Sequence, residues 1–148
     1  MKHVLCSALA LAMALTATQG VSADRGLDAM LEGRSPMSKS ALKKAIAKAE
    51  QEPLGSRGNP VRVEMPEGQR AYLASLRCAD GTRPRYERAG NVGLGVYQSI
   101  IDLYQADCGD AAPGKVEIYM NMYRPGHVET RPVPGFSVAA SDVGGPTT

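Results

Sequence analysis

Two stretches after residue 60 alternate between hydrophobic and polar positions with a period of two. They comprise residues 61–65 and residues 116–123. Because successive side chains of a strand point to opposite faces of its sheet, this alternation predicts strands buried on one face. Between them, residues 96–108 hold a denser set of branched and aromatic residues, which predicts a longer strand buried on both faces for part of its length. We expect the last two strands to form an antiparallel hairpin.

One clear helical pattern precedes these strands, over residues 36–52. Its hydrophobic residues recur every three or four positions. Ser35 is placed to cap the helix, Pro36 suits the first helical position, and Pro53 ends it. The polar face could meet anionic lipids or an acidic partner, or simply face solvent, and it carries Lys39, Lys43, Lys44 and Lys48.

The chain between the first and second strands contains several turn signals. Residues 66–68, Pro-Glu-Gly, are predicted to break the first strand, and residues 69–76 fit both a helical face and strand alternation. We expect a short helix there that runs into a strand near Cys78. Asp80 and Gly81 predict a turn, after which residues 83–88 return as the partner strand at a sheet edge. The glycine-rich residues 90–95 predict a flexible loop.

These elements predict an α+β fold, with a small antiparallel β-sheet and one or two packed helices in a single domain over residues 36–136. All aromatic residues lie between Tyr72 and Phe136, so the sheet-rich core is placed in residues 61–136. Residues 53–60 are interpreted as a linker or broad turn that joins the helix to this core.

The segments on either side of the domain have weaker patterns. Residues 24–35 are short, charged and glycine-containing, which predicts a mobile lead-in. The proline-rich residues 124–136 are expected to be extended and to dock through Val133 and Phe136. Residues 137–148 are small and polar, which predicts a disordered tail.

The first 23 residues have the composition of a secretory signal peptide. A short polar start is followed by an apolar run at residues 4–17 and by small residues at positions 21–23, so Asp24 is the expected mature N-terminus. A membrane-spanning helix needs about 20 apolar residues, and this run is shorter, so we expect no membrane insertion. Cys6 precedes the apolar run, whereas a lipid-modified cysteine would follow it. The predicted location is periplasmic or secreted.

The charge of the chain excludes one class of partner. The formal net charge is +2, and Lys2 is the only charged residue of the predicted leader, so the mature chain is close to neutral. A nearly balanced chain produces no strong global field that would attract nucleic acid. We therefore expect no nucleic-acid partner.

Two cysteines, Cys78 and Cys108, follow the predicted leader. In an oxidising compartment, an even number of cysteines predicts a disulfide, here one that closes a loop of about thirty residues. The alternative is a metal site, but two cysteines with one histidine do not fill a tetrahedral zinc site in a recognisable spacing. We expect the disulfide, no metal and no cofactor.

Three side chains are candidates for acid–base chemistry. His127 is the only histidine after the leader, and Glu129 or Asp102 could orient it as a general base. Asp102 lies between two hydrophobic residues of a predicted strand, where a buried charge needs a partner. It could instead form a glycosidase-like carboxylate pair with Glu117 or Glu129. The alternatives are a turn position for His127 and, for Asp102, a solvent-facing position or a structural ion pair with Arg77, Arg83, Arg85 or Arg88.

A stripe on the polar face of the last strand is a candidate binding surface. Tyr119, Asn121 and Tyr123 recur at every second position, and tyrosines give rigid amphipathic contact area for a sugar or a peptide. A binding role requires this face to be exposed and flat. The alternative is that these side chains cover the sheet edge or contact the helix.

Residues 55–136 contain a series of short motifs. Four of them are Asn59-Pro60-Val61-Arg62, Leu76-Arg77-Cys78-Ala79-Asp80-Gly81, Tyr119-Met120-Asn121-Met122-Tyr123-Arg124-Pro125-Gly126-His127 and Pro132-Val133-Pro134-Gly135-Phe136. With these, the chain resembles small uncharacterised exported proteins of Gram-negative bacteria. The resemblance implies an envelope address and assigns no catalytic residue.

Two functional hypotheses follow. The first is a non-enzymatic domain that binds a protein or glycan partner in the bacterial envelope through the tyrosine stripe and His127. The second is a small periplasmic hydrolase that uses Asp102, Glu129 or His127, which requires Asp102 and His127 to converge in one concave pocket.

Overall fold

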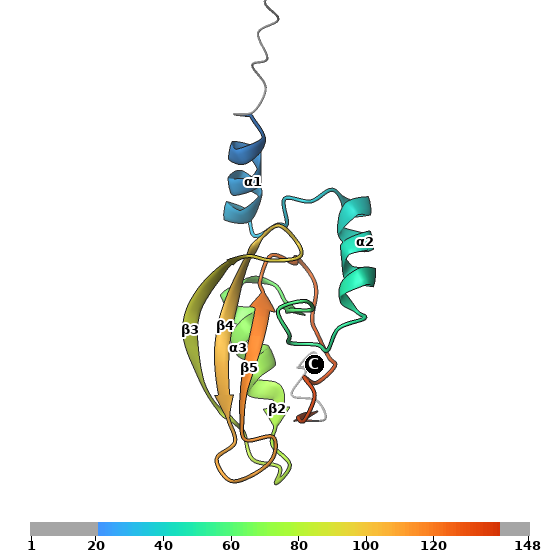
Figure 1. The fold of residues 1–148 in the computed structure, drawn as a ribbon. Helices are drawn as coiled ribbons and strands as arrows, with labels where there is room; N and C mark the ends of the chain where they lie inside the picture. Colours follow the sequence, from blue (N-terminus) through green and yellow to red (C-terminus); the bar gives the residue numbers. More distant parts are fainter. Residues whose placement is uncertain (1–20, 140–148) are drawn as a thin grey trace, which may run out of the picture.

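The computed structural model describes residues 21–139. Most of the predicted leader and residues 140–148 of the predicted tail lie outside this range. The structure has an α+β fold, as predicted, with three helices, a four-stranded sheet and a two-stranded sheet (Figure 1). Among the described residues, no helix combines the length and the apolar character needed to cross a membrane.

The four-stranded sheet has the strand order β1–β5–β4–β3. Its strands are β1 (Val61–Arg62), β3 (Arg85–Leu94), β4 (Ile100–Asp107) and β5 (Lys115–Asn121). The predicted hairpin of β4 and β5 is confirmed, and β3 pairs antiparallel with β4. However, β1 runs parallel to β5, so the sheet is mixed rather than purely antiparallel.

Helix α1 (Val21–Leu31) occupies a segment for which the sequence predicts the end of the leader and a mobile lead-in. Its end is well defined, because Gly33 adopts a φ of 71° and donates a hydrogen bond from its backbone N–H to the carbonyl of Met30. The N–H of Arg34 bonds to the carbonyl of Ala29. This pair of bonds is the Schellman motif, which ends a helix at a glycine.

Helix α2 (Lys39–Ala49) begins later than the predicted start at residue 36. The capping residue is Ser38, whose hydroxyl accepts a hydrogen bond from the N–H of Ala41 at 3.3 Å. Ser35 lies before this helix, where its hydroxyl accepts a hydrogen bond from the N–H of Met37 at 3.3 Å and donates to the carbonyl of Tyr97 at 3.1 Å. The helix packs on Tyr97 through Leu42 and Ala49.

The first strand ends before the Pro-Glu-Gly segment, as predicted, and this segment lies in helix α3 (Met65–Ser75), which begins earlier than the helix expected from residue 69. Pro66 lies in the first turn, where its missing N–H has no intrahelical partner to lose. Gly68 allows a close approach, since a Cβ atom there would lie 3.1 Å from Cβ of Val63. The predicted passage from a helix into a strand before Cys78 is confirmed by β2 (Leu76–Arg77).

The strand partners in two places differ from the prediction. β2 pairs with β6 (Ser137–Val138), not with residues 83–88, so the start of the predicted disordered tail is a strand. Residues 90–95 are not a free loop, because β3 continues to Leu94 through two register shifts. Gly90 and Gly93 have positive φ values, which β-bulges accommodate. The predicted strand over residues 96–108 therefore begins only at Ile100.

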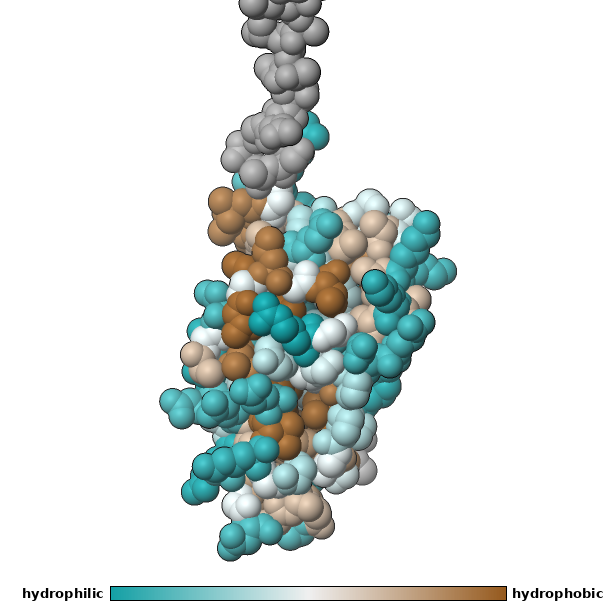
Figure 2. Space-filling view, viewed as in Figure 1, coloured by the Kyte–Doolittle hydropathy of each residue, from teal (hydrophilic) through white to brown (hydrophobic). Residues whose placement is uncertain are grey.

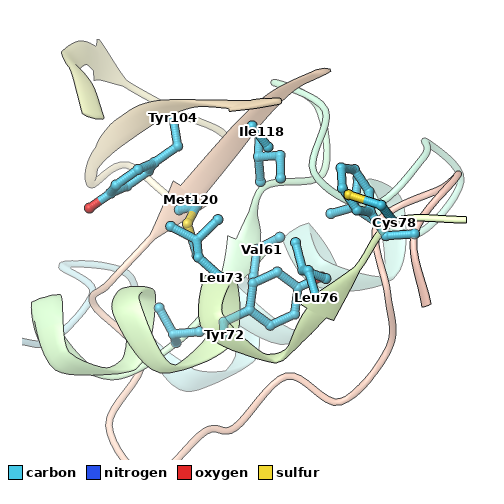
Figure 3. Packing of buried hydrophobic residues seen from close by; sticks show 12 residues of the cluster. Val61, Tyr72, Leu73, Leu76, Cys78, Tyr104, Ile118 and Met120 are labelled. Atoms are coloured by element: carbon cyan, nitrogen blue, oxygen red, sulfur yellow. The ribbon is translucent and has the colours of Figure 1, made fainter. Parts of the chain in front are cut away.

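The main core lies between α3 and one face of the four-stranded sheet (Figures 1 and 3). The predicted docking of the C-terminal segment is confirmed, because Val133 and Phe136 are both buried in it. The cluster comprises Val61, Val63, Tyr72, Leu73, Leu76, Cys78, Tyr104, Ala106, Ile118, Met120, Val133 and Phe136. Figure 2 shows the opposite side of the sheet, where apolar side chains gather over the strands and hydrophilic side chains border them.

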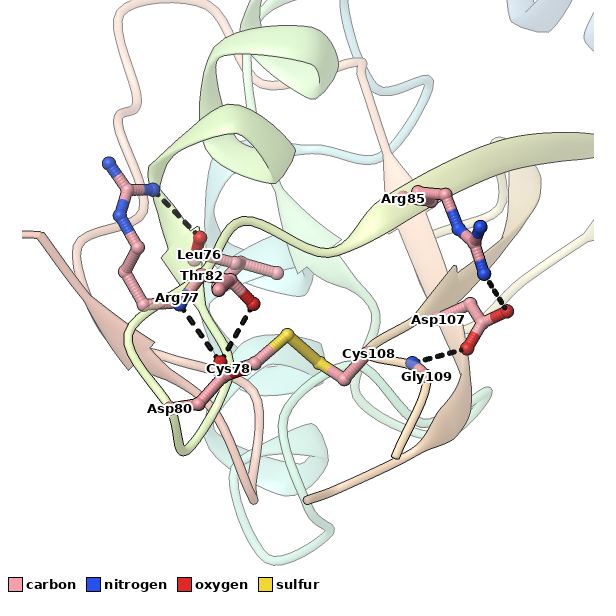
Figure 4. The surroundings of a disulfide bond; sticks show 9 residues. All are labelled: Leu76, Arg77, Cys78, Asp80, Thr82, Arg85, Asp107, Cys108 and Gly109. Atoms are coloured by element: carbon pink, nitrogen blue, oxygen red, sulfur yellow. Dashed lines mark hydrogen bonds and ion pairs between the residues drawn. A yellow bond between two sulfur atoms is a disulfide. The ribbon is translucent and has the colours of Figure 1, made fainter. Parts of the chain in front are cut away.

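The predicted disulfide joins Cys78 to Cys108, with their Cα atoms 5.8 Å apart (Figure 4). It connects the turn after β2 to the end of β4. In that turn, the N–H of Gly81 bonds to the carbonyl of Cys78, and Asp80 accepts a hydrogen bond from the Thr82 hydroxyl at 2.7 Å. The predicted Asp80–Gly81 turn is therefore confirmed, and the disulfide secures the lower end of the sheet in Figure 1.

Candidate functional site

Asp102 is buried on β4, with 3% of its surface exposed, and both of its carboxylate oxygens are engaged. Arg88 Nη2 donates to Oδ1 at 2.6 Å, and Gln69 Nε2 donates to Oδ2 at 2.9 Å. Gln69 also accepts a hydrogen bond from the Tyr104 hydroxyl at 3.1 Å. This polar network links the sheet to α3. Of the four arginines that the sequence offered as ion-pair partners for Asp102, Arg88 is the one that binds it. These contacts give Asp102 a structural ion pair.

The stripe of Tyr119, Asn121 and Tyr123 does not form the exposed flat face that a binding role requires. Asn121 and Tyr123 are buried, and Asn121 Nδ2 donates to the Ser99 hydroxyl at 2.6 Å. Asn121 Oδ1 accepts from the N–H of Tyr123 at 3.2 Å. Only Tyr119 is half-exposed. The reason is topological: β5 is an inner strand, and the turn between β3 and β4 covers its end.

Glu129 lies at the centre of an ionic cluster that the sequence did not reveal, in which Glu129 and Arg62 are buried and their two partners are half-exposed. Arg131 binds Glu129 with a two-pronged contact, in which Nε donates to Oε1 at 2.9 Å and Nη2 donates to Oε2 at 3.0 Å. Arg62 Nη2 lies 3.6 Å from Glu129 Oε2 and 3.2 Å from Glu50 Oε1, and Arg62 Nη1 donates to the Tyr97 hydroxyl at 3.4 Å. We call Glu50, Arg62, Glu129 and Arg131 the ionic cluster.

His127 borders this cluster. Its Nε2 atom lies 3.8 Å from Glu129 Oε2, which is longer than a hydrogen bond. Burial lowers the pKa of His127, and the positive charges of Arg62 and Arg124 lower it further, against the opposing effect of Glu129. The lowered pKa favours the neutral form of the imidazole. The structure brings His127 and Glu129 together but leaves Asp102 in a separate network.

His127 also lies at the boundary of two concavities. The first, which we call the α2 cleft, has a volume of about 650 Å³ and lies between α2 and the segment after β5; its lining comprises Lys39, Lys43, Ile46, Arg124, Pro125, Gly126 and His127. The second, which we call the α3 groove, has a volume of about 970 Å³ and runs between α3 and residues 127–139. Asp102 lines neither of these two concavities.

The lining of the α3 groove is mainly apolar, with charged side chains at its two ends. Met65 and Val128 are large, exposed apolar side chains of this groove, and Val128 is 73% exposed. Glu64 and Glu67 lie toward the start of α3, whereas Arg77 and Arg83 lie beyond its end. The Arg77 guanidinium donates to the carbonyls of Ala74 and Leu76, so it is held in place by the end of the helix.

The residues of this region offer contact surface rather than a complete catalytic group. Both cysteines outside the predicted leader are in the disulfide, and the Glu129 carboxylate is bound by arginines. Within residues 21–139, no set of three or more histidine, cysteine or acidic side chains is arranged to hold a metal ion. What the region can do is hold a ligand in a concave site with a preformed wall.

Several residues of the region could not be identified from the sequence. Arg62 lies between Val61 and Val63, in an alternation that places it on the solvent-facing side of a strand. It is instead 4% exposed, because α2 and residues 127–131 cover that side. In the sequence, the only indication of the ion pair is that Glu129 and Arg131 are two residues apart. Comparison of the chain with protein-family models, with curated proteins and with solved structures finds no match.

The ionic cluster predicts a pH-dependent contribution to stability. Burial by itself raises the pKa of Glu129, but the hydrogen bonds and charge of Arg131, together with Arg62, outweigh it and lower the pKa below 4.5. We expect Glu129→Gln to reduce the free energy of unfolding by about 2 kcal/mol at pH 7, since the buried Arg62 then keeps only one of its two carboxylate partners, Glu50. Urea denaturation measures this loss.

The sign of the pH effect follows from the lowered pKa. The stabilisation by Glu129 is complete above about pH 4.5 and is lost as the pH falls through the folded-state pKa. The difference between wild type and Glu129→Gln should therefore shrink in acid. Glu117→Gln, at an exposed carboxylate of β5, serves as the control and should change stability by less than about 0.5 kcal/mol. A loss at Glu129 that is equal at pH 7 and pH 3 would contradict the account.

Proposed function

We propose that this protein is an exported, non-enzymatic binding domain of the bacterial envelope, and that the α3 groove receives an extended segment of a partner protein. The observation that carries the proposal is the groove itself, about 970 Å³ in volume and lined mainly by apolar side chains. Concave, mostly apolar sites with a few polar groups are the usual form of ligand sites in proteins.

The dimensions of the groove suit a short peptide segment. Helix α3, which forms one wall, has 11 residues and is therefore roughly 16 Å long. An extended chain rises about 3.3 Å per residue, so roughly five residues of a partner fit along this wall. Alternate side chains of such a segment would reach the apolar lining at Met65, Ala71 and Ala74.

The opposite wall offers backbone groups for pairing. Residues 128–130 are outside regular secondary structure, and no described residue accepts a hydrogen bond from their backbone N–H groups. An extended partner can satisfy such groups through main-chain hydrogen bonds, as in strand addition at a sheet edge. The backbone would provide affinity, and the apolar pockets would provide specificity for particular side chains.

The charges at the two ends indicate the orientation of the partner. Glu64 at one end favours a basic residue, and Arg77 at the other favours an acidic residue or a chain terminus. The expected partner segment is therefore apolar in its middle with opposite charges at its ends. A glycan is less well served, because Tyr72, the aromatic side chain in the lining, is buried.

The hydrolase hypothesis has less support. It requires Asp102 and His127 to converge in one pocket, and they belong to separate networks. The remaining pair, His127 and Glu129, lacks a free carboxylate, because Arg131 binds both oxygens of Glu129. The contacts of Glu129 are those of a structural group that shapes the wall shared by the two concavities.

Export to the periplasm is the second part of the proposal. It is supported by the leader-like composition of residues 1–23 and by a disulfide of the kind that persists in oxidising compartments. The expected mature N-terminus, Asp24, lies within α1, so cleavage shortens that helix by residues 21–23 and leaves the elements that follow it intact.

A site-specific crosslink tests the binding proposal. We expect a photoreactive p-benzoylphenylalanine at Thr130, an exposed position of the groove, to form a defined protein adduct in the producing bacterium. Val128→Glu should abolish the adduct, because it places an unpaired charge against the apolar partner segment. The measurement is immunoblotting and mass spectrometry of the adduct.

The control is Leu94→Glu, which changes another highly exposed apolar side chain, 64% exposed, on β3 and outside the groove. It should leave the Thr130 adduct unchanged. Both variants should unfold within about 0.5 kcal/mol of wild type, because both positions are on the surface. If no adduct forms at Thr130, or if the adduct survives Val128→Glu, the groove is not the binding site.

Export is tested by intact-mass measurement on the periplasmic fraction of a Gram-negative producer. The expected species begins at Asp24 and is lighter by two hydrogens than its reduced form, because Cys78 and Cys108 are joined. Iodoacetamide should add no label before reduction and two labels after it. An uncut chain with free thiols in the cytosol would contradict the proposed address.

A further inference from the structure

The α2 cleft combines positive charges from two separate segments of the chain. Lys39 and Lys43 project from α2, and Arg124 comes from the segment that follows β5. Residues four apart on a helix lie on the same face, so the two lysines stand side by side at the cleft. The sequence showed a lysine-rich helix face, but it did not show that Arg124 and His127 would lie opposite two of those lysines.

These three cations have no acidic partner among residues 21–139. No described carboxylate lies within ion-pair distance of Lys39, Lys43 or Arg124. Some basic groups are paired, as Arg88 is with Asp102 and Arg131 is with Glu129, whereas others on the described surface are not. What distinguishes Lys39, Lys43 and Arg124 is that all three line one concavity. Because the whole chain is nearly neutral, a cluster of cations without counter-charge is a local feature and not a consequence of composition.

The position of the lysines on α2 adds to the electrostatic cost of the cluster. The first turn of α2 contains no acidic residue and begins with Lys39. A cation is unfavourable there, because the N-terminus of a helix carries a partial positive charge. Like charges at Lys39 and Lys43 are also unfavourable at a spacing of four residues. A bound anion would relieve both interactions.

The remaining lining completes a site with one apolar side and one polar side. Ile46 and Pro125 are apolar, and the N–H of Gly126 is already bonded to Glu64 Oε2 at 3.0 Å. The described lining contains no carboxylate, and two that contact its residues are engaged: Glu64 binds Gly126, and Glu129 binds Arg131 and Arg62. An anion in the cleft would meet side-chain cations and not an uncompensated carboxylate.

We propose that the α2 cleft binds a small soluble molecule that carries a phosphate monoester. Three cations match a dianion better than a single carboxylate, and the planar guanidinium of an arginine can bind two phosphate oxygens at once. The apolar side of the cleft, at Ile46 and Pro125, accommodates the carbon skeleton of the ester. This site is additional to the proposed peptide groove, although His127 borders both.

A lipid headgroup is the other source of the same chemistry, and the surroundings of the cleft favour a soluble ligand. Membrane-surface helices present an apolar face with aromatic anchors to the bilayer. In α2 the apolar residues Leu42 and Ala49 are instead buried against Tyr97. The helix therefore has no apolar face left with which to enter a membrane.

The test uses the mature chain, in which His127 is the single histidine and gives one set of imidazole NMR signals next to the cleft. Glycerol 3-phosphate is titrated at physiological salt, with inorganic phosphate, succinate and phosphatidylglycerol vesicles as parallel arms. We expect a saturable shift of the His127 signals with glycerol 3-phosphate, a weaker response with phosphate, and at least tenfold weaker binding of succinate. Vesicles should not bind the protein.

Matched variants assign the effect to the cleft. Lys43→Gln and Arg124→Gln should each weaken binding at least tenfold, whereas Lys44→Gln, the same change at the neighbouring exposed lysine outside the cleft, should change it less than twofold. Amide NMR spectra establish that each variant is folded. Val128→Glu should retain phosphate binding, so failure of the peptide groove and failure of this site are distinguishable.

Three results would overturn the proposal. An equal effect of Lys43→Gln and Lys44→Gln would show non-specific charge attraction. Binding of succinate as tight as that of glycerol 3-phosphate would refute the phosphate assignment. Binding that occurs only on phosphatidylglycerol vesicles would identify a lipid surface, not a soluble ester, as the ligand.

Discussion

The buried guanidinium of Arg62 is the constraint on which the arrangement of the two concave sites depends. Arg62 leaves β1 on the side of the sheet away from α3 and contacts groups from three other segments. They are Glu50 at the end of α2, the hydroxyl of Tyr97 in the turn between β3 and β4, and Glu129 in the C-terminal segment. Removing a cation from water costs several kcal/mol, so Arg62 is stable there only while these partners surround it.

The contacts of Arg62 connect α2 and the segment after β5 to the sheet, although these parts of the chain share little apolar contact. Helix α2 buries Leu42 and Ala49 in a small cluster with Tyr97, which is a modest apolar surface for a whole helix. The segment from Arg124 to Arg131 contains no helix or strand. The ionic cluster holds both, and they form walls of the α2 cleft and the α3 groove. The proposed phosphate site and the proposed peptide groove therefore rest on one set of charges.

The parts of the fold that the sequence predicted are those governed by local pattern. The α+β class, the hairpin of β4 and β5, the Asp80–Gly81 turn and the disulfide follow from alternation, turn chemistry and cysteine number. The errors arose where tertiary contacts override local preference. Gly90 and Gly93 form bulges in a paired strand and not a loop, and the helix expected from residue 69 begins at Met65.

The functional region was harder to predict for the same reason. The tyrosine stripe has the alternation of an exposed face, but its strand is internal and the turn before β4 covers Asn121. Arg62 has the position of a solvent-facing residue, but α2 and residues 127–131 bury it. His127 and Glu129 are brought together as expected, whereas the convergence of Lys39, Lys43 and Arg124 depends on how α2 docks, which no local pattern encodes.

Amide hydrogen exchange in Arg62→Met is the most direct test of this central role. Methionine replaces the buried side chain with an apolar one that cannot bind Glu50 and Glu129. We expect the amides of α2 and the hydrogen-bonded amides of Arg124, Gly126 and His127 to lose protection together, by at least tenfold, while those of β4 keep theirs. Unchanged protection of α2, or an equal loss across β4, would show that Arg62 does not hold the two walls in place.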